Sequence, residues 1–255
     1  MYGKSRIERT ICVFNYCEEF MIRGYSSEAR AVINKFVRVS DIVTYLFCPY
    51  KLYLIKYLKL KSKPSRESVL GKIAHEVYLK ASLMIAEKGD VDVNVLLNSV
   101  SHLIDKRFVS LDEVRRLVGY LVDVRRSIPL LDKNVRIEYE VCSDDLKLIG
   151  VVDLIEGNVP IEVKFKDSLS YRDIVQVALY VLLLENKFRV DIDVGYIDLL
   201  KIGERVKVVV NDKLRRSALE LRDLVQMVSI AGLYSKRREN CSNCDLRMEC
   251  RCLFT

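Results

Sequence analysis

Two acidic side chains and one lysine lie close together in a strand-like part of the sequence. Asp153 ends a Gly-x-x-Asp run ahead of a turn, and Glu162 and Lys164 form a Glu-x-Lys pair after it. Because side chains alternate along a strand, Glu162 and Lys164 share a face about 7 Å apart. Asp153 on the preceding strand reaches the same place. Such charges among apolar neighbours are costly without a ligand, which favours a site over two solvated surface strands.

The chemistry that these three residues predict is hydrolysis of a phosphate ester. A hard divalent cation such as Mg²⁺ or Mn²⁺ takes carboxylate oxygens as ligands, here from Asp153 and Glu162. Such an ion polarises a phosphoryl oxygen and lowers the pKa of a bound water. Lys164 would orient that water or neutralise charge in the transition state.

Three further polar side chains are candidates for the same site. Gln176 and Tyr180 are one turn apart on an otherwise apolar helix, so Gln176 needs a polar partner. A contact with Lys164 or with a nucleic-acid backbone would supply one, and a satisfied core glutamine is the alternative. His75, in a Gly-x3-His-Glu run, is the better nitrogen ligand of the two histidines, with a structural histidine as the alternative.

Eight cysteines form a second candidate site. Cys241, Cys244 and Cys250 supply three thiolates within ten residues, and a closed metal site needs a fourth. Cys48, which precedes a proline in the middle of the first predicted helix, is one choice, and Cys252 is a geometrically awkward one. The spacing fits zinc and an iron–sulfur cluster equally well. The other cysteines are interpreted as small buried thiols: Cys12, Cys17 and Cys142.

The composition is that of a globular protein. The 255 residues are 50% hydrophobic and 30% charged, and the formal net charge is +7, which suits a polyanionic partner. No apolar run approaches the roughly 20 residues of a membrane span, and the first residues do not resemble a secretory signal. We therefore expect a cytoplasmic protein. Glutamine occurs only twice, which indicates a thermophilic source.

Periodicity and capping signals predict an α/β protein. Helices come first, then a β-β-β-α-β stretch, a further strand and helix, and a cysteine-rich tail. One helix is expected to begin at residue 40 and to continue through Cys48, and further helices are expected over residues 65–89, 93–108, 111–126, 170–187 and 212–234. Strands are expected over residues 136–141, 147–155, 159–165, 191–200 and 206–210.

Together, these patterns resemble one known family. The Gly-x-x-Asp and Glu-x-Lys runs, the later Gln-x3-Tyr and the earlier Gly-x3-His-Glu are similar to the RecB-like branch of the PD-(D/E)XK nuclease superfamily. An early Cys-Pro with a late Cys-x2-Cys-x5-Cys resembles its iron–sulfur members, above all the CRISPR-associated Cas-four exonucleases. The resemblance covers residues 37–255.

The resemblance implies a restriction-endonuclease-like αβββαβ core with an N-terminal helical region and a cluster-binding tail. The domain boundaries it implies are an extension at 1–36, a helical region at 37–130, the nuclease core at 131–238 and the tail at 239–255. The implied ligands of Mg²⁺ or Mn²⁺ are His75, Asp153, Glu162 and the Val163 carbonyl. Lys164 is the implied catalytic lysine, and Gln176 and Tyr180 match a further motif of the active site. The implied [4Fe–4S] ligands are Cys48, Cys241, Cys244 and Cys250.

The activity that the resemblance implies is metal-dependent exonuclease cleavage of DNA at single-stranded or frayed ends. Its implied role is the trimming of spacer precursors beside CRISPR integrase proteins. Three alternatives stay open: a DNA-repair nuclease of the same superfamily, a non-catalytic DNA-binding subunit of an integration complex, and a zinc-ribbon nucleic-acid binder. The oligomeric state is open as well.

Overall fold

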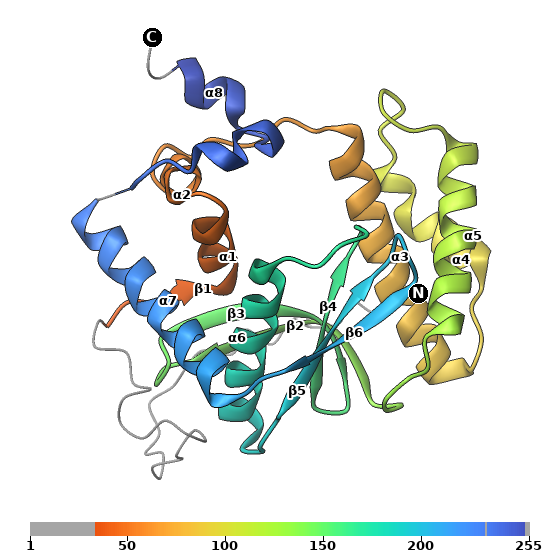
Figure 1. Cartoon of the computed structure of the whole chain (residues 1–255). Helices are drawn as coiled ribbons and strands as arrows, with labels where there is room; N and C mark the ends of the chain where they lie inside the picture. The colour runs from red at the N-terminus through yellow and green to blue at the C-terminus, as the bar shows by residue number, and fades with distance from the viewer. Residues whose placement is uncertain (1–33, 233, 253–255) are drawn as a thin grey trace.

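The computed structural model describes residues 34–232 and 234–252, with a twisted sheet between helices (Figure 1). The predicted extension over 1–36 therefore lies outside the described residues, apart from 34–36. The elements are β1 (Val37–Arg38), α1 (Val39–Phe47), α2 (Pro49–Lys56), α3 (Arg66–Lys88), α4 (Val93–Val100), η2 (Ser101–Leu103), α5 (Leu111–Ser127), β2 (Val135–Ser143), β3 (Leu148–Glu156), β4 (Val159–Lys164), α6 (Tyr171–Phe188), β5 (Val194–Leu199), β6 (Glu204–Val209), α7 (Asp212–Ala231), η3 (Arg238–Asn243) and α8 (Arg247–Cys252). From α5 to β5 the order is αβββαβ, which confirms the predicted core.

The first predicted helix is interrupted at Cys48, so the expected position of this residue in mid-helix is wrong. α1 ends there and α2 begins at Pro49, with the Cys48 backbone extended at φ −164°. Proline lacks an N–H and disfavours a helical residue before it, although it suits the first position of a helix. Cys48 therefore occupies a corner between two helices.

α3 follows its sequence signals, whereas the next helix does not. The Ser65 hydroxyl accepts a backbone N–H in a capping box, and Gly89 ends α3 at φ 77°. The helix predicted over 93–108 is shorter, because α4 passes into the 3-10 turn η2. The hydroxyls of Ser99 and Ser101 donate to carbonyl oxygens there and offer the backbone an alternative to further helix.

The sheet has the order β1-β3-β4-β5-β6, and β2 pairs with β3 off this path. β2 and β3 are antiparallel along their whole length, so β1 and β4 both pair with the other edge of β3. β4 and β5 are parallel, with α6 as the long crossover that a parallel pair requires. β5 and β6 form an antiparallel hairpin.

Two apolar cores fill the space between the sheet and its helices. One joins α1, α6 and α7 to the sheet, and the other joins α3, α4 and α5 to it (Figure 1). α6 is buried nearly all round because it packs against the sheet, α1 and α7. Among the described residues, no helix is both long and apolar enough to cross a membrane.

α6 and β5 lie close together at Gly195, and a substitution there tests their packing. A Cβ on Gly195 would lie 2.4 Å from Val177 Cγ1 and 3.1 Å from the Pro160 carbonyl oxygen. We predict that Gly195→Ala lowers the free energy of unfolding by about 1–3 kcal/mol, the usual cost of overpacking. Urea unfolding followed by circular dichroism measures this change.

Gly119→Ala is the matched control. A Cβ on this residue of α5 meets nothing within 4 Å. The higher helix propensity of alanine should therefore raise the free energy of unfolding by up to about 1 kcal/mol. A Gly195→Ala variant as stable as wild type would contradict the close approach of the two elements.

Candidate active site

β3 and β4 separate at the residues that carry the acidic side chains. Their pairing ends at Leu154↔Ile161. Beyond this pair, the Val163 N–H does not bond to a carbonyl of β3. It donates instead to Asp153 Oδ2 at 2.9 Å, so the carboxylate replaces the missing strand partner. The structure thereby brings Asp153 and Glu162 together where the two strands part.

Glu162 is a buried carboxylate with one unsatisfied oxygen. Its residue is only 2% exposed, its Oε1 accepts from Lys164 Nζ, and its Oε2 has no hydrogen-bond partner among the described residues. Burial raises the pKa of Glu162 well above its usual value, and the charge of Asp153 adds to this effect, which Lys164 opposes. A cation beside Oε2 would remove this cost.

Lys164 is held from a second side by α6. Its Nζ also donates to Gln176 Oε1 at 3.2 Å, and Gln176 Nε2 donates to Tyr180 Oη at 2.9 Å. Although burial opposes the charge, Glu162 raises the pKa of Lys164, so the ammonium stays protonated. Gly150 lies where the Tyr180 ring passes, because a Cβ there would be 3.1 Å from Tyr180 Cε1. The glycine of the Gly-x-x-Asp run thus makes room for this ring.

His75 reaches the site from α3. Its Nε2 lies 3.1 Å from Asp153 Oδ1, and its side chain is 32% exposed at the rim. Burial disfavours a charged imidazole, but the hydrogen bond and charge of Asp153 outweigh it and raise the pKa of His75. Burial also opposes ionisation of Asp153, yet contacts from His75 and the Val163 N–H lower the pKa of this carboxyl.

Glu138 is a site residue that the sequence analysis missed. It lies on β2 opposite Asp153, between the paired residues Ile137 and Tyr139, and its φ is +48°. This conformation is rare for a residue other than glycine and is typical of functional sites. With His75, Glu138 lines a cavity of about 460 Å³. No local sequence signal marks Glu138, because the pattern of β2 is that of an ordinary strand.

The donor set fits a hard divalent cation. His75, Asp153 and Glu162 supply nitrogen and oxygen donors, and the second Glu162 oxygen is an acceptor without a donor. Among the described residues, no group of three or more His, Cys, Asp or Glu side chains is placed so that it could hold a metal ion. His75 instead contacts Asp153 directly.

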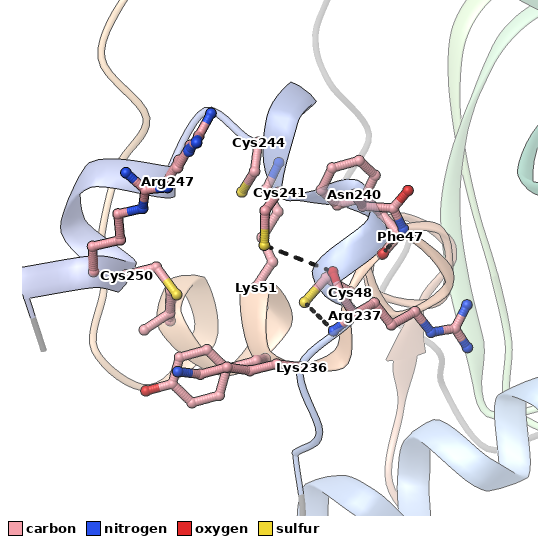
Figure 2. A pocket seen from close by; sticks show the side chains of 13 residues that line it. Phe47, Cys48, Lys51, Lys236, Arg237, Asn240, Cys241, Cys244, Arg247 and Cys250 are labelled. Atoms are coloured by element: carbon pink, nitrogen blue, oxygen red, sulfur yellow. Dashed lines mark hydrogen bonds between the residues drawn. The ribbon is translucent and has the colours of Figure 1, made fainter. Parts of the chain in front are cut away.

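Four cysteines line one cavity between the start of α2 and the C-terminal tail. Cys48, Cys241, Cys244 and Cys250 surround a space of about 550 Å³ (Figure 2). They are free thiols, and burial raises the pKa of both Cys244 and Cys250. Cys142 lies on β2, away from this cavity. The side chains of three other cysteines fall outside the described residues: Cys12, Cys17 and Cys252.

The tail reaches Cys48 by binding the end of α1. Arg237 Nη1 donates to the Leu46 carbonyl at 2.9 Å, and Asn240 Nδ2 donates to the Phe47 carbonyl. The last carbonyl groups of a helix have no partner within it, so these side chains satisfy acceptors that α1 leaves open. The contacts place Cys48 beside η3, where the Arg237 N–H approaches its Sγ at 3.5 Å.

Comparison with known proteins identifies the family. A model of the PD-(D/E)XK nuclease superfamily matches residues 38–251. The chain belongs to this superfamily. No curated protein matches it. Membership agrees with the observed restriction-endonuclease-like fold and implies a nuclease that acts on DNA, and such nucleases typically use Mg²⁺ or Mn²⁺.

The electrostatics of Glu162 lead to a prediction for the metal-free protein. Since its folded pKa is raised, this carboxyl makes the fold less stable as the pH rises from about 4.5, its usual value, toward the folded pKa. At pH 7.5, Glu162→Gln should therefore unfold at a higher temperature than wild type. Each kcal/mol gained in the free energy of unfolding should raise the unfolding temperature by about 2–4 °C. The difference should vanish below pH 4.5.

Added Mn²⁺ provides the complementary measurement. It should raise the unfolding temperature of wild type but not that of Glu162→Gln, because ligands that bind only the folded state stabilise it. Scanning calorimetry in chelator and in Mn²⁺ tests both expectations. A variant that is less stable than wild type in chelator at pH 7.5 would contradict the unsatisfied state of this carboxylate.

Proposed function

We propose that the chain is a metal-dependent deoxyribonuclease that hydrolyses phosphodiester bonds at single-stranded or frayed DNA ends. The observation that carries the proposal is the buried, unpaired Oε2 of Glu162 beside Asp153, with Lys164 held against the same carboxylate. A non-catalytic DNA-binding subunit would have no use for this costly arrangement. Family membership supports the nuclease activity.

The roles follow from the contacts of each residue. His75, Asp153, Glu162 and the Val163 carbonyl would hold the cation, which supplies Lewis acidity at the scissile phosphate and lowers the pKa of a water. Lys164 is a fixed positive charge that stabilises charge developing on the phosphate. Gln176 and Tyr180 hold the Lys164 ammonium in place through the two hydrogen bonds described above.

Basic and aromatic side chains near the site support binding of single-stranded DNA. The Arg172 guanidinium lies 4.9 Å from the centre of the Phe47 ring, and Tyr171 beside it is 54% exposed. Lys166, between β4 and α6, forms an ion pair with the buried Asp173 and therefore adds little net charge there. Phosphates bind such cations and unpaired bases stack on exposed rings, with affinity that falls steeply as salt increases.

Cleavage assays with labelled DNA test the catalytic roles. In Mn²⁺, Asp153→Asn, Glu162→Gln and Lys164→Met should each lower the cleavage rate at least roughly a hundredfold, because each removes a metal ligand or a fixed transition-state charge. Asp144→Asn is the control, since this carboxylate lies in the exposed turn between β2 and β3. Full activity in Glu162→Gln would overturn the active-site proposal.

Substrate shape tests the preference for ends. Linear single strands and frayed duplexes should be degraded, whereas circular single strands should resist. Equal cleavage of linear and circular strands would rule out the exonuclease part of the proposal and leave the nuclease part intact.

We further propose that Cys48, Cys241, Cys244 and Cys250 hold a [4Fe–4S] cluster. All four thiols line one cavity. Thiolate ligands suit zinc and iron–sulfur clusters alike, and the resemblance to the iron–sulfur members of the superfamily favours the cluster. Basic side chains around the cavity, among them Lys236, would offset the thiolate charge.

Anaerobic purification tests the cluster. The protein should be brown and contain four irons, and Cys48→Ala should lose both the colour and thermal stability. Cys48 and Cys241 are 193 positions apart (241 − 48), and a link that closes so long a loop stabilises a fold by about 5 kcal/mol in the simple entropy model. Cys142→Ala is the control and should keep the iron. One zinc per chain, or iron retained by Cys48→Ala, would exclude this ligand set.

The combination of nuclease residues with these cysteines supports a role in trimming spacer precursors beside CRISPR integrase proteins. A repair nuclease of the same superfamily would use the same residues. The genes next to the coding sequence distinguish the two roles, because a spacer-trimming enzyme is encoded beside an integrase.

A further inference from the structure

α3 is attached to the sheet at two polar points that lie on either side of β4. His75 contacts Asp153 on β3 at 3.1 Å. About one turn later, Tyr78 Oη donates to Asp198 Oδ2 on β5 at 2.8 Å. β4, which carries Glu162, runs between these two strands. α3, which carries His75, is therefore bonded to β3 and to β5, the two strands on either side of β4.

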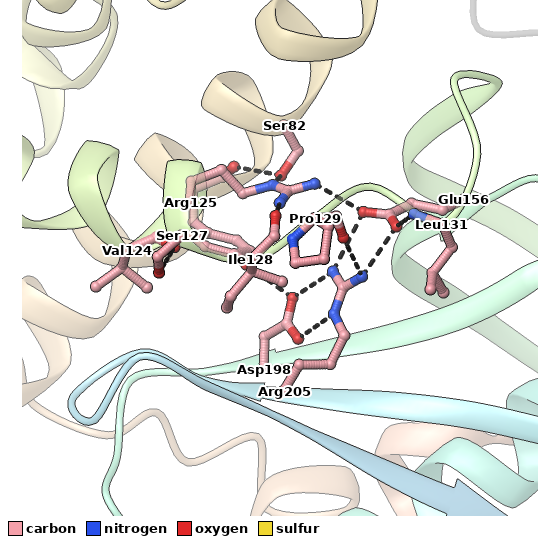
Figure 3. Close-up of polar contacts among 11 residues, drawn as sticks. Ser82, Val124, Arg125, Ser127, Ile128, Pro129, Leu131, Glu156, Asp198 and Arg205 are labelled. Atoms are coloured by element: carbon pink, nitrogen blue, oxygen red, sulfur yellow. Dashed lines mark hydrogen bonds and ion pairs between the residues drawn. The ribbon is translucent and has the colours of Figure 1, made fainter.

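The second attachment point is itself rigidly held. Arg205 binds both oxygens of Asp198, with Nε at 2.7 Å from Oδ1 and Nη2 at 2.9 Å from Oδ2. The same guanidinium binds Glu156 on β3, and Arg125 binds Glu156 from α5 at 2.8 Å (Figure 3). Asp198 and Glu156 are at most 1% exposed. This network fixes Asp198 as an anchor for the helix.

A further contact ties the backbone of α3 to the same network. Arg125 Nε donates to Ser82 Oγ at 2.6 Å, and Ser82 Oγ donates to the Tyr78 carbonyl at 2.9 Å. The Arg125 guanidinium also lies 5.5 Å from the centre of the Tyr78 ring, and Arg66 pairs with Glu113 on α5. Against the sheet, α3 packs through apolar side chains such as Ile73 and Val77, and such packing is not directional. The hydrogen bond of the Tyr78 hydroxyl is directional, so it fixes how α3 lies on the sheet, which apolar packing alone does not.

The hydroxyl is not required to satisfy Asp198. Both carboxylate oxygens keep an Arg205 donor without it, and two arginines balance two carboxylates in the network. The removal of one neutral hydroxyl therefore leaves no charge uncompensated. The His75 side chain is partly exposed and meets Asp153 at 3.1 Å, so the position of α3 decides whether its imidazole reaches that carboxylate.

We infer that Tyr78 is a positioning residue for the active site: its hydrogen bond to Asp198 sets α3 so that His75 faces Asp153. Groups that are hydrogen-bonded directly to a metal ligand are worth about 10–100-fold in metal affinity, and Tyr78, which acts through α3, is expected at the lower end of that range. This inference rests on the proposed function of His75 as a ligand. It concerns a residue that touches neither metal nor DNA.

Mn²⁺ affinity, measured by electron paramagnetic resonance without DNA, tests the inference. Tyr78→Phe keeps the buried ring and should bind Mn²⁺ about tenfold more weakly, the lower end of the usual range. Tyr57→Phe is the matched control, because it removes an equally short hydrogen bond, at 2.8 Å, from the residue that follows α2 to the Ser229 carbonyl on α7. It should bind Mn²⁺ as wild type does.

A double-mutant cycle separates positioning from general loosening of the fold. His75→Ala should weaken Mn²⁺ binding, and Tyr78→Phe should then weaken it no further. If Tyr78→Phe binds Mn²⁺ normally, or if its effect persists in the His75→Ala background, the inference is wrong while the proposed function stands. If His75→Ala itself binds Mn²⁺ as wild type does, both the ligand role of His75 and the inference built on it are overturned.

Discussion

The hydrogen bond from the Val163 N–H to the Asp153 carboxylate is the contact on which the rest of the site depends. A buried backbone donor without a partner is costly, so β3 and β4 can part only where a side chain replaces the missing strand contact. Asp153 does this and at the same time becomes a firmly ionised carboxylate. The hydrogen bond that lets the strands part therefore also lowers the pKa of Asp153, in addition to the larger effect of His75.

The site carries charges that the fold by itself does not favour. Glu162 is buried with one oxygen unsatisfied, whereas Glu156, near the end of the same hairpin, binds two arginines. The contrast separates two kinds of buried carboxylate in one sheet. Glu156, with both oxygens bound by arginines, joins elements of the fold, whereas Glu162, with one oxygen unsatisfied, is destabilising unless a cation binds. Such local cost is typical of active sites, where function and stability compete.

The errors in the sequence-based elements arise where a local feature competes with a regular backbone. Pro49 divides the first predicted helix, and serine hydroxyls end the predicted helix at 93–108 early. Glu138 has a left-handed backbone inside a strand whose sequence pattern is regular. Periodicity averages over several residues, so a change of conformation at one residue is invisible to it.

The sequence by itself determined the αβββαβ order and the grouping of Glu162 with Lys164, because periodicity, capping and strand alternation depend on near neighbours. Tertiary structure alone decided where β3 and β4 part, that Glu162 Oε2 has no partner among the described residues, and that Tyr78 ties α3 to Asp198. These features depend on distances between segments far apart in the chain, which only the packing of helices against the sheet sets.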